Sequence, residues 1–495
     1  MKPFTITLLA SAVALAAAKF DFPSHRELTT EMYDSGEVHE SIMAAKHGTW
    51  DRNRAAGKFK SEQYPALKKN RVKCKDGLAI VEKGNANQTF KCNNIDLLDF
   101  KSHADLGSFT GEGSSSWGWT SDDGREFVAI GQADGTAFAE ISPKGKLVYL
   151  GRLPQQSEFS IWREIRTYKN YVIIGSEAVD HGVQIFDLTK LLDINPSKPV
   201  NFSTTADLTG HFTELPVGRT HNIVIHEALD YAVAVGAQPR NSTCLAGMIF
   251  IDLKDPSNPT TPGCAGQDGY VHDAQCIVYH GPDKRYEGHD ICYGYNEDTL
   301  TIYDVGDKVG VNSTTIISKT PYVGASYTHQ GWVLDPDWQE YLLLDDELDE
   351  EEQSGPSADG YPVTFIFDIS DLENPKHTGQ YKSKAYSIDH NQYIYDGLSY
   401  QSNYGAGLRV LDISSIPDDP TGGGIEEVGF FDIFPEDDHL PNGGLIDFVG
   451  TWSHYAGFAS GHILVNTIER GAFIVKMSKF DKRGKGRHHK KPRNV

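Results

Sequence analysis

Residues 221–253 read HNIVIHEALDYAVAVGAQPRNSTCLAGMIFIDL, and similar stretches recur along the chain. In this copy His221 opens a first hydrophobic strand, a second follows at 231–235, and a third ends in a hydrophobic run that contains Asp252. Short antiparallel strands separated by turn residues are typical of a β-meander. The stretch therefore predicts one sheet of a repeating all-β protein.

A Trp or a His opens each repeat. The seven opening residues are Trp117, Trp162, His221, His272, His329, His390 and Trp452. Their spacings run from 45 to 62 residues, and periods of this size are typical of propeller blades. A fourth strand usually follows the closing run, so each repeat predicts a four-stranded blade. The chain is therefore predicted to be all-β, a seven-bladed β-propeller over residues 94–478.

The seventh repeat lacks a fourth strand, because Met477 is followed only by a basic tail. A hydrophobic stretch at 94–100 precedes the first repeat and belongs to no other blade. A propeller leaves no exposed strand edge. We therefore expect this N-terminal strand to pair with the strand around Phe473 and to close the ring.

The two ends of the chain predict export. Residues 1–18 contain Lys2, an apolar stretch and three consecutive Ala residues, as in a secretory signal peptide. Residues 19–93 are expected to form a small N-terminal cap, with a short helix near 38–45 and a disulfide hairpin. Residues 479–495 are expected to form a basic, disordered tail. We expect a secreted, extracellular monomer without a transmembrane segment, because no other apolar stretch approaches ~20 residues.

Cysteine usage agrees with an extracellular protein. Six Cys allow 15 connectivities, and the expected hairpins favour Cys74 with Cys92, Cys244 with Cys264, and Cys276 with Cys292. No CxxC spacing supports a zinc site instead. Four Asn-X-Ser/Thr acceptor sites predict N-glycosylation at Asn87, Asn201, Asn241 and Asn312.

The formal net charge is −22, which argues against nucleic acid as the partner. The basic tail either keeps the chain soluble or is processed off, or else it docks to an anionic wall or membrane polymer. The expected partner is an extracellular ligand or a cell-wall component.

Equivalent opening positions would lie at one level around the central channel. Four consecutive blades would then contribute His221, His272, His329 and His390, opposite Trp117, Trp162 and Trp452. Imidazoles that converge on an axis suit one transition-metal ion, Zn, Fe, Cu or Mn, with Glu164, Asp273 and Asp389 as carboxylates that orient them. The ligand site would be lined by Trp117, Trp162, Arg163, Glu164 and Trp452. The alternative is a structural ring in which each His bonds to the neighbouring blade.

The acidic run DDELDEEE at 345–352 follows a strand of the fifth repeat, so we expect it in a turn. Such a run is usually a solvated loop. The functional alternative is a calcium site at Asp345, Asp346 and Glu347, because calcium prefers carboxylate oxygens.

Several stretches together resemble one family of propellers. They are SIWREI (160–165), HNIV (221–224), DGYVHDAQC (268–276), YNEDTL (295–300), YTHQGW (327–332), LLDDELDE (343–350) and DHN (389–391). The chain resembles, over residues 74–477, the LVIVD-repeat propellers of the choice-of-anchor B family and their fungal relatives described as regulatory P domain-containing proteins. The resemblance implies a propeller outside the cell and names no reaction. The basic tail and the long cap depart from the family pattern.

Two functions remain open at this point. One is a secreted propeller with a channel-mouth site, metal-dependent, that binds or acts on an extracellular ligand such as a carbohydrate. The other is a non-catalytic extracellular protein-interaction scaffold with a structural His ring. No catalytic residue is identified.

Overall fold

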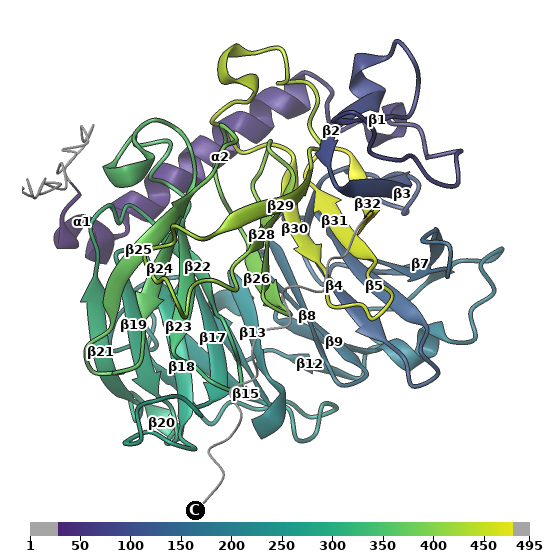
Figure 1. The fold of residues 1–495 in the computed structure, drawn as a ribbon. Helices are drawn as coiled ribbons and strands as arrows, with labels where there is room; N and C mark the ends of the chain where they lie inside the picture. Colours follow the sequence, from purple (N-terminus) through teal and green to yellow (C-terminus); the bar gives the residue numbers. More distant parts are fainter. Residues whose placement is uncertain (1–27, 479–495) are drawn as a thin grey trace, which may run out of the picture.

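The computed structural model describes residues 28–478. The expected signal peptide and the expected basic tail therefore lie outside the described residues. Seven antiparallel sheets follow one another along the chain and are arranged around a central axis (Figure 1). This is the seven-bladed β-propeller that the repeats predict.

Each blade is a meander of four strands, with the innermost strand first in the chain except in blade 7. Blades 1 to 3 comprise β4 (Gly113–Thr120), β5 (Glu126–Gln132), β6 (Gly135–Ile141) and β7 (Leu147–Pro154); β8 (Arg163–Tyr168), β9 (Tyr171–Ser176), β10 (Val183–Asp187) and β12 (Gly210–Phe212); and β13 (Asn222–His226), β14 (Tyr231–Val235), β15 (Met248–Asp252) and β16 (Gly263–Ala265). Blades 4 to 6 comprise β17 (Asp273–Val278), β18 (Asp290–Asn296), β19 (Thr299–Asp304) and β21 (Thr315–Pro321); β22 (Thr328–Val333), β23 (Tyr341–Asp346), β24 (Val363–Asp368) and β25 (Lys376–Lys382); and β26 (Gln392–Tyr395), β27 (Leu398–Ser402), β28 (Leu408–Asp412) and β29 (Glu426–Phe431).

The N-terminal strand closes the ring, as predicted. Blade 7 consists of β30 (Thr451–Tyr455), β31 (Ile463–Thr467), β32 (Gly471–Met477) and, on its outer edge, β3 (Ile95–Ser102). Phe100 of β3 stands opposite Phe473 of β32, and the two ring centroids are 4.5 Å apart. The pairing removes the strand edge that would otherwise stay open in the last blade.

Short elements decorate the blades. β1 (Leu78–Ile80) and β2 (Thr89–Asn93) extend blade 6 beyond β29, whereas β11 (Val200–Asn201) and β20 (Gly310–Val311) add parallel edges to blades 1 and 3. Single 3₁₀ turns lie at Ser61–Gln63, Ala86–Gln88, Leu188–Leu191, Pro216–Gly218, Glu227–Leu229, Gly355–Ser357 and Pro441–Gly443.

The three predicted disulfides are confirmed. The bonds are Cys74–Cys92, Cys244–Cys264 and Cys276–Cys292. Cys276 of β17 and Cys292 of β18 stand directly opposite each other, the hairpin geometry that a bridge needs.

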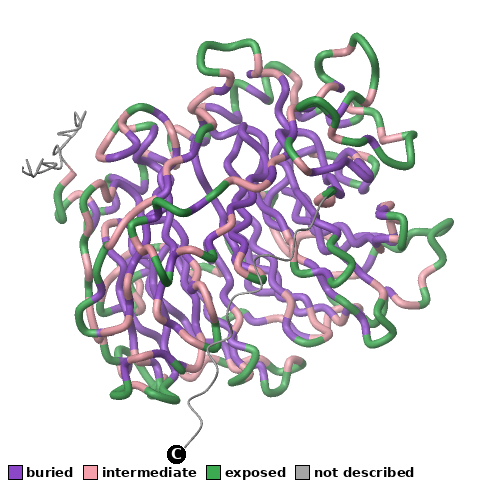
Figure 2. The backbone as a smooth tube through the Cα atoms, viewed as in Figure 1, coloured by how far each residue is buried: buried purple, intermediate pink, exposed green. Residues whose placement is uncertain are grey.

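The hydrophobic core lies between neighbouring blades. One cluster, for example, joins Ile173 of blade 2 to Ile223 and Ala234 of blade 3. Because both faces of a blade are covered, middle strands such as β14 are buried along their whole length. Buried residues accordingly dominate the blades, and exposed residues gather in the peripheral loops (Figure 2).

Two helices precede the propeller, α1 (Thr30–Ser35) and α2 (Glu37–Ala55). The expected short helix at 38–45 is thus part of a helix of 19 residues, which lies across one face of the propeller (Figure 1). Val38, Ile42, Lys46 and Trp50 are buried, and their spacing of four places them on one side of the helix. Among the described residues, no helix is long and apolar enough to cross a membrane.

Candidate functional site

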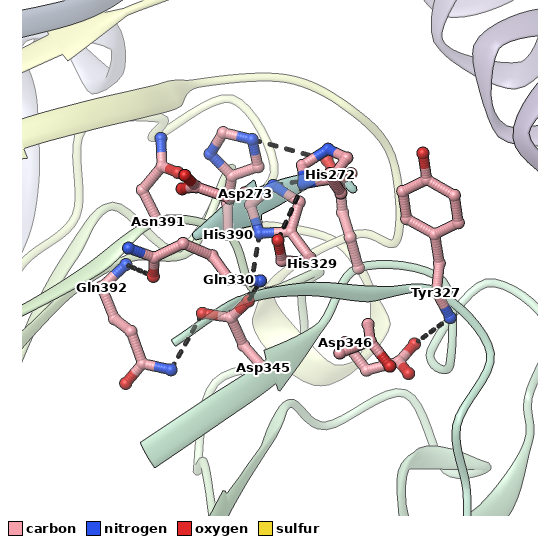
Figure 3. Close-up of polar contacts among 12 residues, drawn as sticks. His272, Asp273, Tyr327, His329, Gln330, Asp345, Asp346, His390, Asn391 and Gln392 are labelled. Atoms are coloured by element: carbon pink, nitrogen blue, oxygen red, sulfur yellow. Dashed lines mark hydrogen bonds and ion pairs between the residues drawn. The ribbon is translucent and has the colours of Figure 1, made fainter. Parts of the chain in front are cut away.

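The four His residues form a continuous arc at the start of four innermost strands. His221, His272 and His390 precede β13, β17 and β26, and His329 lies in β22. Successive ring centroids are 4.4, 4.4 and 4.5 Å apart, and all four side chains are buried. The four predicted ligands therefore lie next to one another, and Figure 3 shows three of the imidazoles side by side. Of the four, His272 and His329 bring donor atoms within 4.8 Å of one another and of Glu347.

Each imidazole is held through its Nδ1 atom. His272 Nδ1 lies 2.7 Å from the carbonyl oxygen of His329, and His390 Nδ1 lies 2.7 Å from that of Trp452. A carbonyl oxygen only accepts hydrogen bonds, so both Nδ1 atoms must carry the proton. The Nε2 lone pairs of His272 and His390 are consequently left for other partners.

The two remaining His residues are oriented by carboxylates. His329 Nδ1 lies 3.0 Å from Asp345 Oδ1, and His221 Nδ1 bonds to Glu177. The predicted orienting residues Glu164, Asp273 and Asp389 were therefore the wrong carboxylates. Of the described residues, none forms an ion pair or a hydrogen bond with the Asp389 carboxylate.

Three of the four imidazoles in the arc are neutral near neutral pH. Burial lowers the pKa of His390 to about 4 and holds the pKa values of His272 and His329 well below the ordinary value. The positive charge of nearby Lys46 contributes to the lowering of all three pKa values. Three neutral imidazoles therefore face the space that Lys46 enters.

The ammonium group of Lys46 on α2 is the cation at this site. Its Nζ lies 2.7 and 2.9 Å from the two carboxylate oxygens of Glu347, and Lys46 is 2% exposed. His390 Nε2 and His329 Nε2 lie 3.5 and 3.8 Å from the same carboxylate, to which the Tyr404 hydroxyl also donates. Burial by itself would raise the pKa of Glu347, but the Lys46 ammonium and the hydrogen bond from Tyr404 hold it below its ordinary value. The centre of the arc is therefore a buried ion pair.

Two Trp residues of the opposite arc pack against α2. The indole of Trp50 lies 4.9 Å from that of Trp162 and 5.9 Å from that of Trp452, centroid to centroid. Trp50 Nε1 also donates to the carbonyl oxygen of Phe448 at 2.9 Å. Trp162 and Trp452 thus pack against a helix of their own chain.

The prediction that Trp117 shares this level was wrong. Its ring packs against Tyr393 at 5.0 Å and Tyr455 at 5.1 Å, and these residues follow the opening residues His390 and Trp452 by three positions. Trp117 therefore lies deeper in the channel, and Ser114 occupies the equivalent opening position. The repeat pattern misplaced Trp117 because this blade has a Ser, and not a Trp or His, at the opening position.

The other predicted ligand residues point into the protein. Arg163 Nε donates to the carbonyl oxygen of Gln132, and its Nη1 donates to His181 Nε2 at 2.9 Å. Glu164 forms an ion pair with Arg166, whose guanidinium lies 4.4 Å from the Trp117 ring centroid. Arg163 and Glu164 therefore hold blades and channel layers together.

The acidic run is not the solvated turn that its composition predicts. Asp345, Asp346 and Glu347 are buried. Asp345 accepts from the backbone N–H of Gln330 and Asp346 from that of Tyr327 (Figure 3). Glu347 binds Lys46. The three carboxylates face different partners, so they do not gather around one calcium position.

The four predicted glycosylation sites are sterically available. Asn87, Asn201, Asn241 and Asn312 are all exposed. Glycosylation itself stays a prediction.

Among the described residues, two groups of donor atoms are close enough to hold one metal ion. The first is His272, His329 and Glu347, whose donor atoms lie within 4.8 Å of one another. It shares Glu347 with Lys46, so the ammonium and a metal ion would compete for one carboxylate. The second group, Asp432, Asp437 and Asp438, lies outside the arc.

Sequence reasoning missed the residues that α2 contributes. His39 Nδ1 lies 2.7 Å from the Tyr327 hydroxyl oxygen, and burial lowers the pKa of His39 to about 3. The available signal was a Lys at position 46 in the helical series Val38, Ile42, Trp50, since a charged residue on an apolar face needs a partner.

No family model and no curated protein matches the chain. Solved structures similar in fold include Kuenenia stuttgartiensis hydrazine synthase, with a TM-score of 0.47 and 11% identity over 75% of this chain and 96% of that chain. The C-terminal WD40 domain of Sif2 has a TM-score of 0.41 and 10% identity over 78% and 92% of the two chains. No functional conclusion follows from these similarities, and membership of the LVIVD-repeat family stays an expectation.

Proposed function

We propose that this protein is an extracellular binding scaffold whose channel mouth is permanently closed by its own helix α2. The propeller fold and the three disulfides are consistent with this class. The observation that carries the proposal is the position of Lys46, whose buried ammonium occupies the centre of the His arc and pairs with Glu347.

The His arc has a structural role in this proposal. The Nδ1 bond of His272 reaches the next blade at His329, and that of His390 reaches the next blade at Trp452. Such bonds tie successive blades together and satisfy buried polar groups. A substrate that approached the arc from the α2 face would first have to displace the buried contacts of His39, Lys46 and Trp50.

A second candidate is the predicted transition-metal site. It is favoured by the donor atoms of His272, His329 and Glu347, which lie within 4.8 Å of one another. Imidazole nitrogens held through Nδ1 are typical ligands of Zn, Cu, Fe or Mn. These residues would bind the ion only after Lys46 has left, and α2 would then act as a removable cover over a site for an extracellular ligand.

Metal analysis separates the two candidates. The purified full-length protein and its Lys46→Met variant are incubated with Zn²⁺, Mn²⁺, Fe²⁺ or Cu²⁺, desalted and analysed for bound metal. The scaffold proposal predicts far less than one ion per chain in both proteins. One ion per chain in the wild type, lost on His329→Ala, would overturn it.

The same experiment identifies a covered metal site. In that case Lys46→Met gains one ion per chain, whereas the wild type gains none. Arg52→Met is the matched control, because Arg52 lies on the same helix and forms an exposed pair with Asp447. It should leave the metal content unchanged.

A further inference from the structure

A second group of acidic residues lies far from the His arc in sequence, in the loop that follows β29. One carboxylate oxygen each of Asp432, Asp437 and Asp438 lies within 4.8 Å of the others. Asp432 and Asp437 are buried, whereas Asp438 is partly exposed. Three carboxylates at this separation repel one another unless a cation lies among them.

The protein supplies only part of the required compensation. Asp438 Oδ1 lies 2.7 Å from Lys91 Nζ, and Asp432 Oδ1 accepts from the backbone N–H of Phe434 at 3.0 Å. Asp437 is 2% exposed, and no described residue donates a hydrogen bond to its Oδ1. A buried carboxylate oxygen without a partner is costly and calls for a ligand.

The surroundings of Asp437 keep its carboxylate close to the backbone of blade 6. A Cβ atom on Gly405 would lie 2.9 Å from Asp437 Oδ2, so the carboxylate packs closely against this turn of blade 6. Asp432 and Asp437 are buried next to Asp438, and negative charge on adjacent buried carboxylates is unfavourable without an added cation.

We propose that Asp432, Asp437 and Asp438 form a calcium-binding site. All three donors are carboxylate oxygens, which calcium prefers, whereas zinc and copper favour nitrogen and sulfur ligands. Calcium–oxygen distances of about 2.3–2.6 Å allow ligand oxygens to lie up to about 5 Å apart. Lys91 then neutralises Asp438 at the rim of the site, and the ion neutralises the buried pair.

The site has a structural consequence. The backbone N–H of Asp432 donates to the carbonyl oxygen of Lys91 on β2, and Cys92 of β2 pairs with Phe431 of β29. A calcium ion in this loop would therefore fasten the N-terminal disulfide hairpin to blade 6. Calcium sites in extracellular modules usually have dissociation constants of about 10⁻⁴–10⁻³ M.

Calorimetric titration of the chelator-treated full-length protein with CaCl₂ tests the proposal. We expect one site per chain with a dissociation constant near 10⁻⁴–10⁻³ M and a higher melting temperature with calcium. Asp437→Asn, which keeps the shape but removes the charge, should weaken binding at least about tenfold. Without calcium this variant should melt no lower than the wild type, because the carboxyl group that it replaces has a buried oxygen without a hydrogen-bond partner.

Two further variants make the test decisive. Asp418→Asn, an exposed residue of the preceding loop, should bind calcium as the wild type does. Asp438→Asn, at the rim of the site, should weaken binding and replaces Asp437→Asn if that variant does not fold. A wild type that binds no calcium below about 10 mM, or site variants that bind as tightly as the wild type, would overturn the proposal.

Discussion

Replacing Lys46 by Met should destabilise the protein strongly, because it leaves the Glu347 carboxylate buried without its cation. Glu347 is fully buried, and Lys46 is 2% exposed. Removing one partner of a buried ion pair typically costs about 3–5 kcal/mol. Met preserves most of the length and apolar surface of the Lys side chain, so the loss reports the charge.

The expected change in melting temperature follows from the size of the cooperative unit. If α2 and the propeller unfold together, about 450 residues contribute about 2.1 cal/mol/K each, or about 1 kcal/mol/K in total. The melting temperature should then fall by about 3–5 °C. Differential scanning fluorimetry of the purified protein measures this shift.

A double-mutant cycle assigns the loss to the ion pair. Glu347→Gln alone leaves the Lys46 ammonium buried without its carboxylate and should cost a similar amount. The double variant, Lys46→Met with Glu347→Gln, should recover most of the loss because neither charge remains. Arg52→Met is the control, since its pair with Asp447 is exposed and should contribute about 0–1 kcal/mol. If Lys46→Met lowers the free energy of unfolding by no more than Arg52→Met does, Lys46 does not occupy the arc.

Two further predictions concern ring closure and acid stability. Phe100→Ala should cost about 3–5 kcal/mol in a urea titration, because Phe100 packs on Phe473 across the closing strand pair; a loss as small as that of exposed Phe109→Ala would argue against closure by β3. Burial lowers the pKa of His390 to about 4 from the 6.5 of an unfolded His, so the unfolded chain binds this proton first. The contribution of the buried, neutral His390 to stability is therefore present above pH 6.5 and is lost as the pH falls toward 4. His390→Gln should reduce the slope of the unfolding free energy over this interval by up to about 1.4 kcal/mol per pH unit, and an unchanged slope would contradict the assignment.

The parts of the fold that depend on local pattern could be predicted from the sequence. Hydrophobic strands repeat at a regular spacing, and the strand at 94–100 had no partner except the incomplete seventh blade. The disulfide between Cys276 and Cys292 follows from hairpin register. In each case the interacting residues are set by strand order, which the repeat makes visible.

The chemistry of the channel mouth depends on contacts between distant residues, which a single sequence does not display. Lys46 and Glu347 are separated by 301 positions, and the acidic run around Glu347 resembles a surface loop until α2 covers it. Trp117 was misplaced because blade 1 has Ser114 at the opening position and its aromatic residue three positions later. The His arc was found because each His keeps its place at the start of a strand.

Hydrogen–deuterium exchange of the full-length protein tests most directly whether α2 packs stably over the channel mouth. Peptides that cover residues 37–55 should be protected for as long as those from the inner strands, because the helix opens only with its buried contacts. In Lys46→Met the same peptides should exchange faster. If residues 37–55 of the wild type exchange within seconds, as in a loosely attached helix, the closed channel mouth and the proposed function are both contradicted.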